Sequence, residues 1–389
     1  MTRSTLGVGV VGFGWMGQVH SRAYSRLLHH FPDAPLLPRL VAVADTDPAR
    51  RAQAMQAYGF AAAVDDWQAL VAQDDVEVVS VAGPNFVHRD VAVAAAQAGK
   101  HIWVEKPVGR HLADTTDVAE AVREAGVASA VGFNYRNAPA VDLARQLVCE
   151  GRLGRVESVT VRLLSDYAAH PDAMLSWRFD PALAGTGAIG DLACHGLDLA
   201  THVVGEEAGQ ISEVVADLAT FIPHRPQPLD PTAPRSTILA GGPTGPVGND
   251  DQVGALLRFA GGARGVLMAS RVAVGEQCTY GIEVHGDRGA LAWDFRRMGE
   301  LRTALDQGYT DVAWRRVQVA PGHGELGAFQ PGAGVTMGYD DLKVVEAERL
   351  IRSIAEGRPI GATLDDALRT AETADALARS AAERRWVSL

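Results

Sequence analysis

The sequence predicts an α/β fold in two parts: an N-terminal doubly wound parallel sheet, and a C-terminal α+β domain with a large, mostly antiparallel open sheet. The chain of 389 residues is longer than an ordinary single domain of about 100–200 residues. Up to residue 137, continuous apolar runs alternate with helical stretches, which is typical of βαβ units with both sheet faces covered. Beyond it, apolar runs follow one another across glycine turns, which indicates antiparallel strands. We therefore expect domains at residues 1–137 and 138–389.

The N-terminal domain is expected to alternate strands and helices along its whole length. The apolar runs predict strands at residues 7–12, 40–44, 76–82, 101–104 and 128–132. The stretches between them predict helices at residues 15–28, 47–58, 65–71, 91–98 and 112–124. A proline-rich detour at residues 31–40 lengthens the connection to the second strand.

The C-terminal domain is expected to form a meander flanked by helices. Its predicted strands cover residues 156–164, 211–221, 252–259, 264–271, 280–285 and 290–293. Its predicted helices cover residues 140–150, 187–204, 340–356 and 363–385. Seven of the nineteen prolines fall in residues 223–249, so we expect a long surface loop there.

Composition and charge exclude several classes of partner. The three cysteines are scattered, which argues against a disulfide framework or a structural metal, and no metal site is expected. The net charge of −11 comes without a Lys/Arg cluster, so nucleic acids and anionic membranes are unsuitable partners. No apolar stretch approaches the roughly 20 residues of a membrane span. We expect a cytoplasmic protein.

A glycine motif stands between the first predicted strand and helix. It reads Gly12-Phe13-Gly14-Trp15-Met16-Gly17. Glycines at such a turn let backbone N–H groups and the helix N-terminus approach a pyrophosphate, as in the Rossmann fold. A plain strand-to-helix turn is the alternative interpretation.

Asp45 ends the second predicted strand, where a carboxylate accepts hydrogen bonds from the adenosine ribose and repels a 2′-phosphate. The pattern therefore favours NAD over NADP. Asp45 or Asp47 could alternatively cap the next helix, and Arg50 and Arg51 leave some use of NADP open.

Three polar residues suit acid–base work on an alcohol. Asp191 and His195 are four residues apart on a predicted helix, so they share one face. His195, whose ordinary pKa is about 6.5, would take the hydroxyl proton during hydride transfer, and Asp191 would orient it. Lys106 would stabilise the developing alkoxide or relay the proton. Alternatively, His195 is a core residue whose ring nitrogens are hydrogen-bonded within the protein.

The motifs together resemble the glucose–fructose oxidoreductase/inositol dehydrogenase (Gfo/Idh/MocA) family across essentially the whole chain. They are Gly12–Gly17, Pro84–His88, Glu105-Lys106-Pro107, Phe133–Arg136 and Gly190–His195, in that order. The resemblance implies an NAD(P)-dependent dehydrogenase acting on CH–OH groups, with Lys106, Asp191 and His195 as catalytic residues. It also implies cofactor contacts from Pro84, Asn85, His88, Glu105 and Lys106, besides the glycine motif and Asp45.

Three segments, Phe31–Pro38, Phe133–Arg136 and Ser176–Phe179, are similar to the branch of the family that includes levoglucosan, L-glucose and scyllo-inositol dehydrogenases. That resemblance implies a sugar, anhydrosugar or cyclitol substrate. It implies a pocket formed by Lys106, Asn134, Tyr135, Trp177, Arg178, Asp191, His195 and Tyr339.

The second domain is expected to bind substrate and to form a homodimer or homotetramer through its sheet. Apolar residues occur at both strand parities, at 255–257 and 266–268, which would leave an apolar outer face. The loop at 223–249 covering that face is the alternative. Two other functions stay open: a reductase of keto-sugar intermediates, some of them nucleotide-linked, and a non-catalytic nucleotide-binding regulator.

Overall fold

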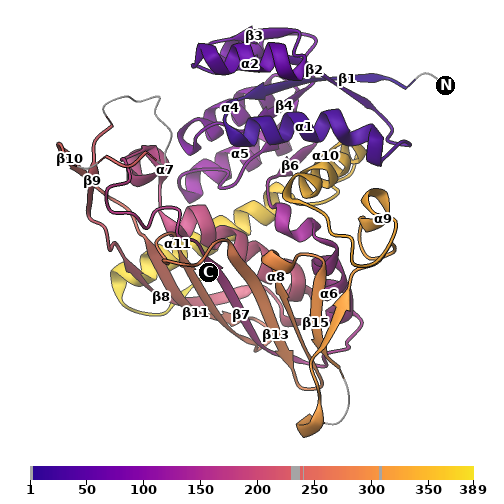
Figure 1. The fold of residues 1–389 in the computed structure, drawn as a ribbon, viewed down its shortest axis with the longest axis vertical. Coiled ribbons are helices and arrows are strands. Elements are labelled where there is room, and N and C mark those ends of the chain that lie inside the picture. Colours follow the sequence, from indigo (N-terminus) through magenta and orange to yellow (C-terminus); the bar gives the residue numbers. More distant parts are fainter. Residues whose placement is uncertain (1–2, 229–236, 240, 306–308) are drawn as a thin grey trace. The chain divides into compact units, whose positions relative to one another are not determined.

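The computed structural model describes residues 3–228, 237–239, 241–305 and 309–389 (Figure 1). Two compact units divide the chain. Unit 1 consists of Met1–Asn137 and Met337–Arg369, and unit 2 consists of Ala138–Thr336 and Thr370–Leu389. The first boundary falls where the sequence predicts it, but assigning all of residues 138–389 to the second domain is wrong for Met337–Arg369.

Unit 1 is built on a six-stranded parallel sheet in the order β3-β2-β1-β4-β5-β6, which confirms the doubly wound prediction. The order reverses between β1 and β4, and ligands of such sheets bind at this switch point. The strands are β1 (Thr5–Val11), β2 (Leu37–Ala44), β3 (Ala62–Val64), β4 (Val78–Val81), β5 (His101–Val104) and β6 (Ser129–Val131). β4 is buried along its whole length, as expected of a central parallel strand.

The helices of unit 1 come from both of its segments. They are α1 (Trp15–His30), α2 (Pro48–Tyr58), α3 (Trp67–Val71), α4 (Asn85–Gln97), α5 (Leu112–Ala125), the 3₁₀ turn η1 (Asn134–Asn137), α10 (Tyr339–Glu356) and the start of α11 (Leu364–Glu383). α10 packs against α1, and Arg22 and Arg26 of α1 pair with Asp340 and Asp341 of α10, each at 2.6 Å. Ala362, Leu364 and Ala367 join the core of the parallel sheet. These contacts place the late segment in unit 1.

Unit 2 contains a nine-stranded sheet in the order β16-β15-β14-β13-β7-β12-β11-β8-β17. β12 and β7 are parallel, and the other pairs are antiparallel, which confirms the mostly antiparallel prediction. A simple meander is wrong, because β7 lies between β12 and β13. The strands are β7 (Val156–Leu164), β8 (Ile211–Ala219), β11 (Gln252–Phe259), β12 (Arg264–Ser270), β13 (Thr279–Gly286), β14 (Ala290–Asp294), β15 (Glu300–Ala304), β16 (Arg315–Gln318) and β17 (Val387–Ser388).

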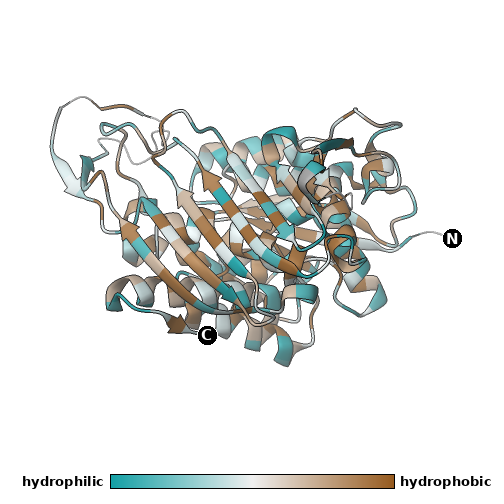
Figure 2. Ribbon diagram, turned by 90° about the horizontal axis from the view of Figure 1, so that it is seen from below, coloured by the Kyte–Doolittle hydropathy of each residue, from teal (hydrophilic) through white to brown (hydrophobic). Residues whose placement is uncertain are grey.

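Helices pack on one face of this sheet, and in Figure 2 the strands lie in front of them. They include α6 (Pro139–Cys149), α8 (Cys194–Ala208) and the remainder of α11. The short helical elements of unit 2 are η2 (Trp177–Phe179), α7 (Pro181–Ala184), the π-helix η3 (Ile189–Ala193), η4 (Phe295–Arg297), η5 (Tyr309–Asp311) and α9 (Leu326–Phe329). Along β11 and β12, buried residues alternate with more exposed ones. The more exposed residues, some apolar and some polar, point to the other face of the sheet.

The proline-rich segment 223–249 carries more regular structure than a surface loop. In the part that the structure describes, β9 (His224–Pro226) pairs with β10 (Thr244–Pro246), and Ile238 bridges Ala173. Arg225 is fully buried, and its guanidinium donates to the carbonyl oxygens of residues 168, 170 and 173. The remainder of this predicted loop, residues 229–236 and 240, lies outside the described residues. Within the described residues, no helix is long and apolar enough to cross a membrane.

Candidate active site

The carboxyl ends of the parallel strands gather the predicted residues of unit 1. Gly12 follows β1, Asp45 follows β2, Pro84 comes shortly after β4, Lys106 shortly after β5 and Asn134 shortly after β6. Because parallel strands end at the same edge of a sheet, this edge is the expected binding edge of a doubly wound fold.

The glycine motif has the geometry of an anion cradle. Gly12 has φ +85°, and a Cβ there would lie 2.5 Å from Gly83 Cα, while a Cβ at Gly17 would lie 1.9 Å from the Gly12 carbonyl oxygen. A Cβ at Gly14 would meet only one atom, Nη1 of Arg50, at 4.0 Å. No side chain caps the N-terminus of α1, whose first turn holds no acidic residue. The open space and the uncapped helix end fit the pyrophosphate of a dinucleotide.

Asp45 holds this cradle in shape. Its buried carboxylate accepts a hydrogen bond from Phe13 N at 2.6 Å and another from Asp47 N at 2.9 Å. Arg50 Nη1 lies 3.6 Å from Asp45 Oδ2. The N-cap of α2 is Asp47, which accepts from Ala49 N at 2.8 Å, so the capping alternative for Asp45 is wrong. Each Asp45 oxygen has a second lone pair, and the ribose contact stays a prediction.

Tyr339, predicted to line the substrate pocket, lies against the glycine motif. It begins α10, stacks on Trp15 with ring centroids 5.0 Å apart, and directs its hydroxyl toward Met16 Sδ at 3.7 Å. These contacts suit a position beside the cofactor cradle, so its substrate contact stays a prediction.

The residues predicted beside the nicotinamide are largely engaged with the protein. Pro84 caps α4, and Asn85 is its first residue. The ring nitrogens of His88 lie 2.8 Å from the Pro107 carbonyl oxygen and 2.9 Å from that of Gly83. Glu105 is buried and pairs with other side chains of unit 1. In this structure His88 and Glu105 form internal hydrogen bonds, and their expected cofactor contacts stay predictions. The Lys106–Pro107 peptide is cis.

Asn134 and Tyr135 lie in η1, directly after the last parallel strand. Asn134 is fully buried, and among the described residues neither end of its carboxamide has a hydrogen-bond partner. An unsatisfied buried amide costs about 1–3 kcal/mol. A hydroxyl-rich ligand would remove that cost, which fits the predicted substrate contact.

In unit 2, Asp191 and His195 lie at a junction of helix types. The sequence predicts one helix from residue 187, but Asp191 belongs to the π-helix η3, and α8 begins at Cys194. The Tyr167 hydroxyl donates to Asp191 Oδ2 at 2.5 Å. Desolvation and the negative charge of Asp191 raise the pKa of Tyr167 well above its usual value, so the phenol remains a donor. His195 is buried.

Asp250 fixes the start of this helical segment. Its two carboxylate oxygens accept from Gly187 N at 2.7 Å and from Ile189 N at 2.9 Å. A Cβ at Gly187 would lie 1.9 Å from the Asp250 carbonyl oxygen, so only glycine fits there. Asp250 therefore positions the turn that carries Asp191.

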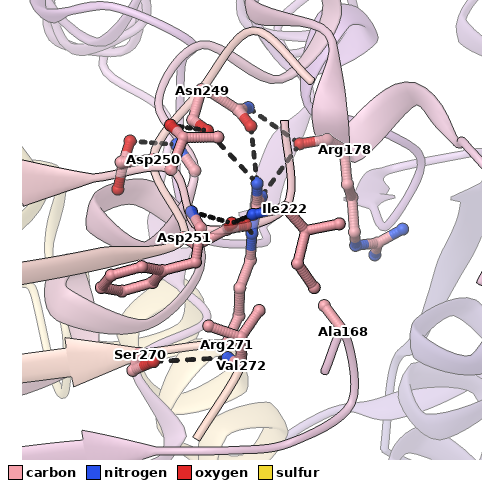
Figure 3. A network of polar contacts seen from close by, with 12 residues as sticks. Ala168, Arg178, Ile222, Asn249, Asp250, Asp251, Ser270, Arg271 and Val272 are labelled. Atoms are coloured by element: carbon pink, nitrogen blue, oxygen red, sulfur yellow. Dashed lines mark hydrogen bonds and ion pairs between the residues drawn. The ribbon is translucent and has the colours of Figure 1, made fainter. Parts of the chain in front are cut away.

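The neighbours of Asp250 hold the segment that carries Trp177 and Arg178 (Figure 3). Arg271 forms a buried ion pair with Asp251 at 2.9 Å and donates to Asn249 Oδ1 at 2.8 Å. Asn249 Nδ2 donates to the Arg178 carbonyl oxygen at 2.8 Å. The Arg178 guanidinium lies over the Trp177 ring, 4.2 Å from its centroid. Residues 249–251 thus brace both predicted parts of the site in unit 2.

Sequence reasoning missed the roles of Tyr167 and Asp250 and the pairing of Lys343 with Glu105. The run Asn249-Asp250-Asp251 before an apolar strand was the available signal for Asp250. Lys343 and Glu346, three residues apart among the apolar residues of one predicted helix, were the available signal for buried charges. Within the described residues, no cluster of three or more His, Cys, Asp or Glu side chains could hold a metal ion.

A doubly wound sheet with an open glycine cradle at its switch point defines a dinucleotide-binding protein. The model of an oxidoreductase family with an NAD-binding Rossmann fold, GFO_IDH_MocA, matches residues 6–133, and the model of a GFO/IDH/MocA C-terminal domain matches residues 141–292. The chain belongs to this family of oxidoreductases.

Two curated relatives and one solved structure match along the whole chain. Levoglucosan dehydrogenase of Pseudarthrobacter phenanthrenivorans is 37% identical over 386 residues, covering 99% of this chain and 98% of the relative. Inositol 2-dehydrogenase of Rhizobium meliloti is 30% identical over 389 residues, covering 99% of each. The structure of levoglucosan dehydrogenase in complex with NADH and levoglucosan is 36% identical, with a TM-score of 0.91 over 99% of both chains.

Proposed function

We propose that this protein oxidises a secondary alcohol of a sugar, anhydrosugar or cyclitol with NAD. The observation that carries the proposal is the full-length likeness to a levoglucosan dehydrogenase, 37% identical over 99% of the chain. The open glycine cradle supports the cofactor, and the sequence contains the predicted catalytic residues Lys106, Asp191 and His195.

Bound NAD supplies the hydride acceptor. As the C–H bond of the alcohol gives up hydride, its O–H bond must give up a proton, and a carbonyl forms. His195 takes that proton, since imidazole titrates near neutral pH. The Lys106 ammonium stabilises the alkoxide as negative charge develops. Asp191, held by the Tyr167 hydroxyl at 2.5 Å, orients the imidazole or the substrate.

Substrate recognition falls to residues that present amide, aromatic and cationic groups. Asn134 offers both ends of an unsatisfied carboxamide, and Tyr135 follows it in the same turn. Trp177 offers an aromatic face and Arg178 a guanidinium on a braced segment. Aromatic faces with a few directed donors and acceptors suit a polyhydroxylated ring.

The cofactor preference is proposed to be NAD rather than NADP. Asp45 closes the edge of the cradle with a buried carboxylate, which repels a 2′-phosphate. Arg50 beside it offsets part of that repulsion, since its guanidinium lies 3.6 Å away.

We also propose a cytoplasmic homodimer or homotetramer that forms through the open face of the unit 2 sheet. Leu256, Val266 and Met268 are 49%, 46% and 38% exposed there. Leu256 on β11 is directly opposite Val266 on β12, so the apolar side chains form a contiguous strip. A second copy would remove that strip from water.

The test is a panel of hexoses, inositols and anhydrosugars with NAD or NADP, followed by NADH or NADPH absorbance. The proposal expects turnover of at least one member, with NAD preferred. The panel is repeated with keto sugars and NADH, because a reductase would use the same groups in reverse. Binding of NADH without turnover in either direction would favour the regulator and overturn the dehydrogenase.

A further inference from the structure

Glu105, the residue before Lys106, lies in a buried charge cluster that the proposed chemistry does not use. Its Oε1 accepts from Lys343 Nζ at 2.5 Å and lies 2.9 Å from His20 Nε2. Lys343 and His20 are fully buried, and Glu105 nearly so. The three residues come from β5's end, α10 and α1, all within unit 1.

Electrostatics make Lys343 and Glu105 the ionised pair of this cluster. Lys343 Nζ also lies 2.8 Å from Glu346, but burial raises the pKa of Glu346 to about 7. Burial opposes ionisation of Glu105 as well, yet the nearby Lys343 ammonium outweighs it and lowers the pKa of Glu105 below its usual range. Burial lowers the pKa of His20 to about 4, so its neutral ring donates from Nε2.

The carboxylate of Glu105 has little freedom to move. A Cβ at Gly132 would lie 2.6 Å from the Glu105 carboxylate, so backbone closes one side of it. The backbone N–H of Glu105 donates to Val81 O on the neighbouring strand at 2.9 Å. Glu105 is therefore fixed at both its main chain and its side chain.

The residue on the other side of Lys106 is held independently. The Pro107 carbonyl oxygen lies 2.8 Å from His88 Nδ1, and His88 Nε2 lies 2.9 Å from the Gly83 carbonyl oxygen. His88 is buried in α4. Glu105 and Pro107, the two neighbours of Lys106, are thus both held by hydrogen bonds, and they fix the backbone from which the Lys106 side chain extends.

We propose that Lys343 is a positioning residue, which holds Glu105 and thereby fixes the backbone from which Lys106 reaches its proposed place in catalysis. This rests on the role proposed for Lys106. A shift of about 1 Å in a reacting group can lower a rate by about 100-fold. Removing Lys343 would leave Glu105 as an uncompensated buried charge, and its backbone would move to reach water.

The experiment compares Lys343→Met with Lys100→Met, a matched control in the same unit. Lys100 is also buried, but its ammonium donates to the backbone carbonyls of Gln73 and Val76 at 2.8 and 2.6 Å. We expect both variants to be less stable in urea. We expect kcat at saturating substrate and NAD to fall about 10–100-fold in Lys343→Met only, while NADH affinity by fluorescence stays within about threefold.

A double variant separates positioning from packing. Glu105→Gln/Lys343→Met removes both charges, so we expect it to recover about tenfold or more of the kcat lost in Lys343→Met. Equal kcat in Lys343→Met and wild type, or no recovery in the double variant, would overturn the proposal. If Lys343→Met does not fold, Glu105→Gln alone decides: kcat lowered about tenfold supports the proposal, and kcat within about twofold overturns it.

The same assay includes Lys106→Met and wild-type enzyme. Absence of wild-type turnover would count against the proposed function. Equal turnover of Lys106→Met and wild type would count against the role of Lys106. Loss of turnover in Lys106→Met with full activity in Lys343→Met would contradict the positioning role of Lys343 and leave the role of Lys106 intact.

Discussion

Replacing Asp250 with alanine should destabilise unit 2 and disturb the turn that carries Asp191. Asp250 is buried and accepts from two backbone N–H groups, Gly187 N and Ile189 N. Hydrogen bonds to a charged group contribute about 1.5–3 kcal/mol each, and loss of an ordinary N-cap costs about 0.5–2 kcal/mol. Because water would reach the freed N–H groups only in part, we expect a loss of about 2–4 kcal/mol in the free energy of unfolding.

The assay is urea unfolding followed by circular dichroism, with Asp66→Ala as the control. Asp66 caps α3 at the surface and accepts from Gln68 N at 3.1 Å, so its loss should cost about 1 kcal/mol. Asp250→Asn keeps one acceptor oxygen and should lie between wild type and Asp250→Ala. In steady-state assays, kcat should fall about tenfold in Asp250→Ala and stay unchanged in Asp66→Ala.

Two results would refute this reasoning. If Asp250→Ala lost no more stability than Asp66→Ala, the two internal hydrogen bonds would not hold the turn. If stability fell as expected but kcat did not change, Asp250 would stabilise the unit without positioning Asp191.

Four further outcomes follow from the structure. Lys106→Met or His195→Ala should lower kcat by about 10²–10⁴ while NADH still binds in a fluorescence titration. Wild type should prefer NAD at least about tenfold in kcat/KM, about 1.4 kcal/mol, and Asp45→Ala should weaken NAD use and abolish that preference. Val266→Asp should lower the mass measured by sedimentation at micromolar concentration. In urea unfolding, wild type should lose stability between pH 7 and 5, and in His20→Gln this loss should be smaller by about 2 kcal/mol. The reason is that unfolded His20 binds a proton below about pH 6.5, whereas the folded ring binds one only near pH 4.

Each of these has a contrary result. Near-wild-type turnover in either catalytic variant would remove that residue from the mechanism, and equal kcat/KM with NADP in wild type would remove the role of Asp45. Val274→Asp changes an 84% exposed turn residue and should leave the mass unchanged. A monomeric wild type would mean that the sheet needs no partner. A stability curve of His20→Gln parallel to that of wild type would show that His20 titrates normally.

The sequence was most informative where local pattern determines structure. The glycine motif, Asp45 and the apolar strands of unit 1 lie where their spacing predicts, because strand ends and turns depend on neighbouring residues. The insertion of β7 between β12 and β13 and the return of α10 to unit 1 depend on contacts between residues far apart in sequence. Such contacts leave no periodic signal. The same holds for Lys343 and Glu105, which are 238 residues apart.

The internal hydrogen bonds of His88 and Glu105 show a second limit. A motif identifies which residues stand at a strand end, but the direction of each side chain depends on what else is buried there. Both residues hold the backbone beside Lys106 through partners on α1, α10 and within the strand-end turns. Their position was predictable from the chain, whereas their partners were not.

The composition of unit 1 from two segments has a consequence during synthesis. The ribosome releases the parallel sheet early, but Lys343 and the apolar residues near position 364 emerge only about 230 residues later. At ordinary elongation rates that interval lasts about 10–50 s. During it, Glu105 lacks the Lys343 ammonium, and the surface of α1 that α10 covers is open to water. The nascent cofactor-binding half therefore depends on the late segment Met337–Arg369 to finish folding, and a fragment ending at residue 137 should aggregate when it is made alone.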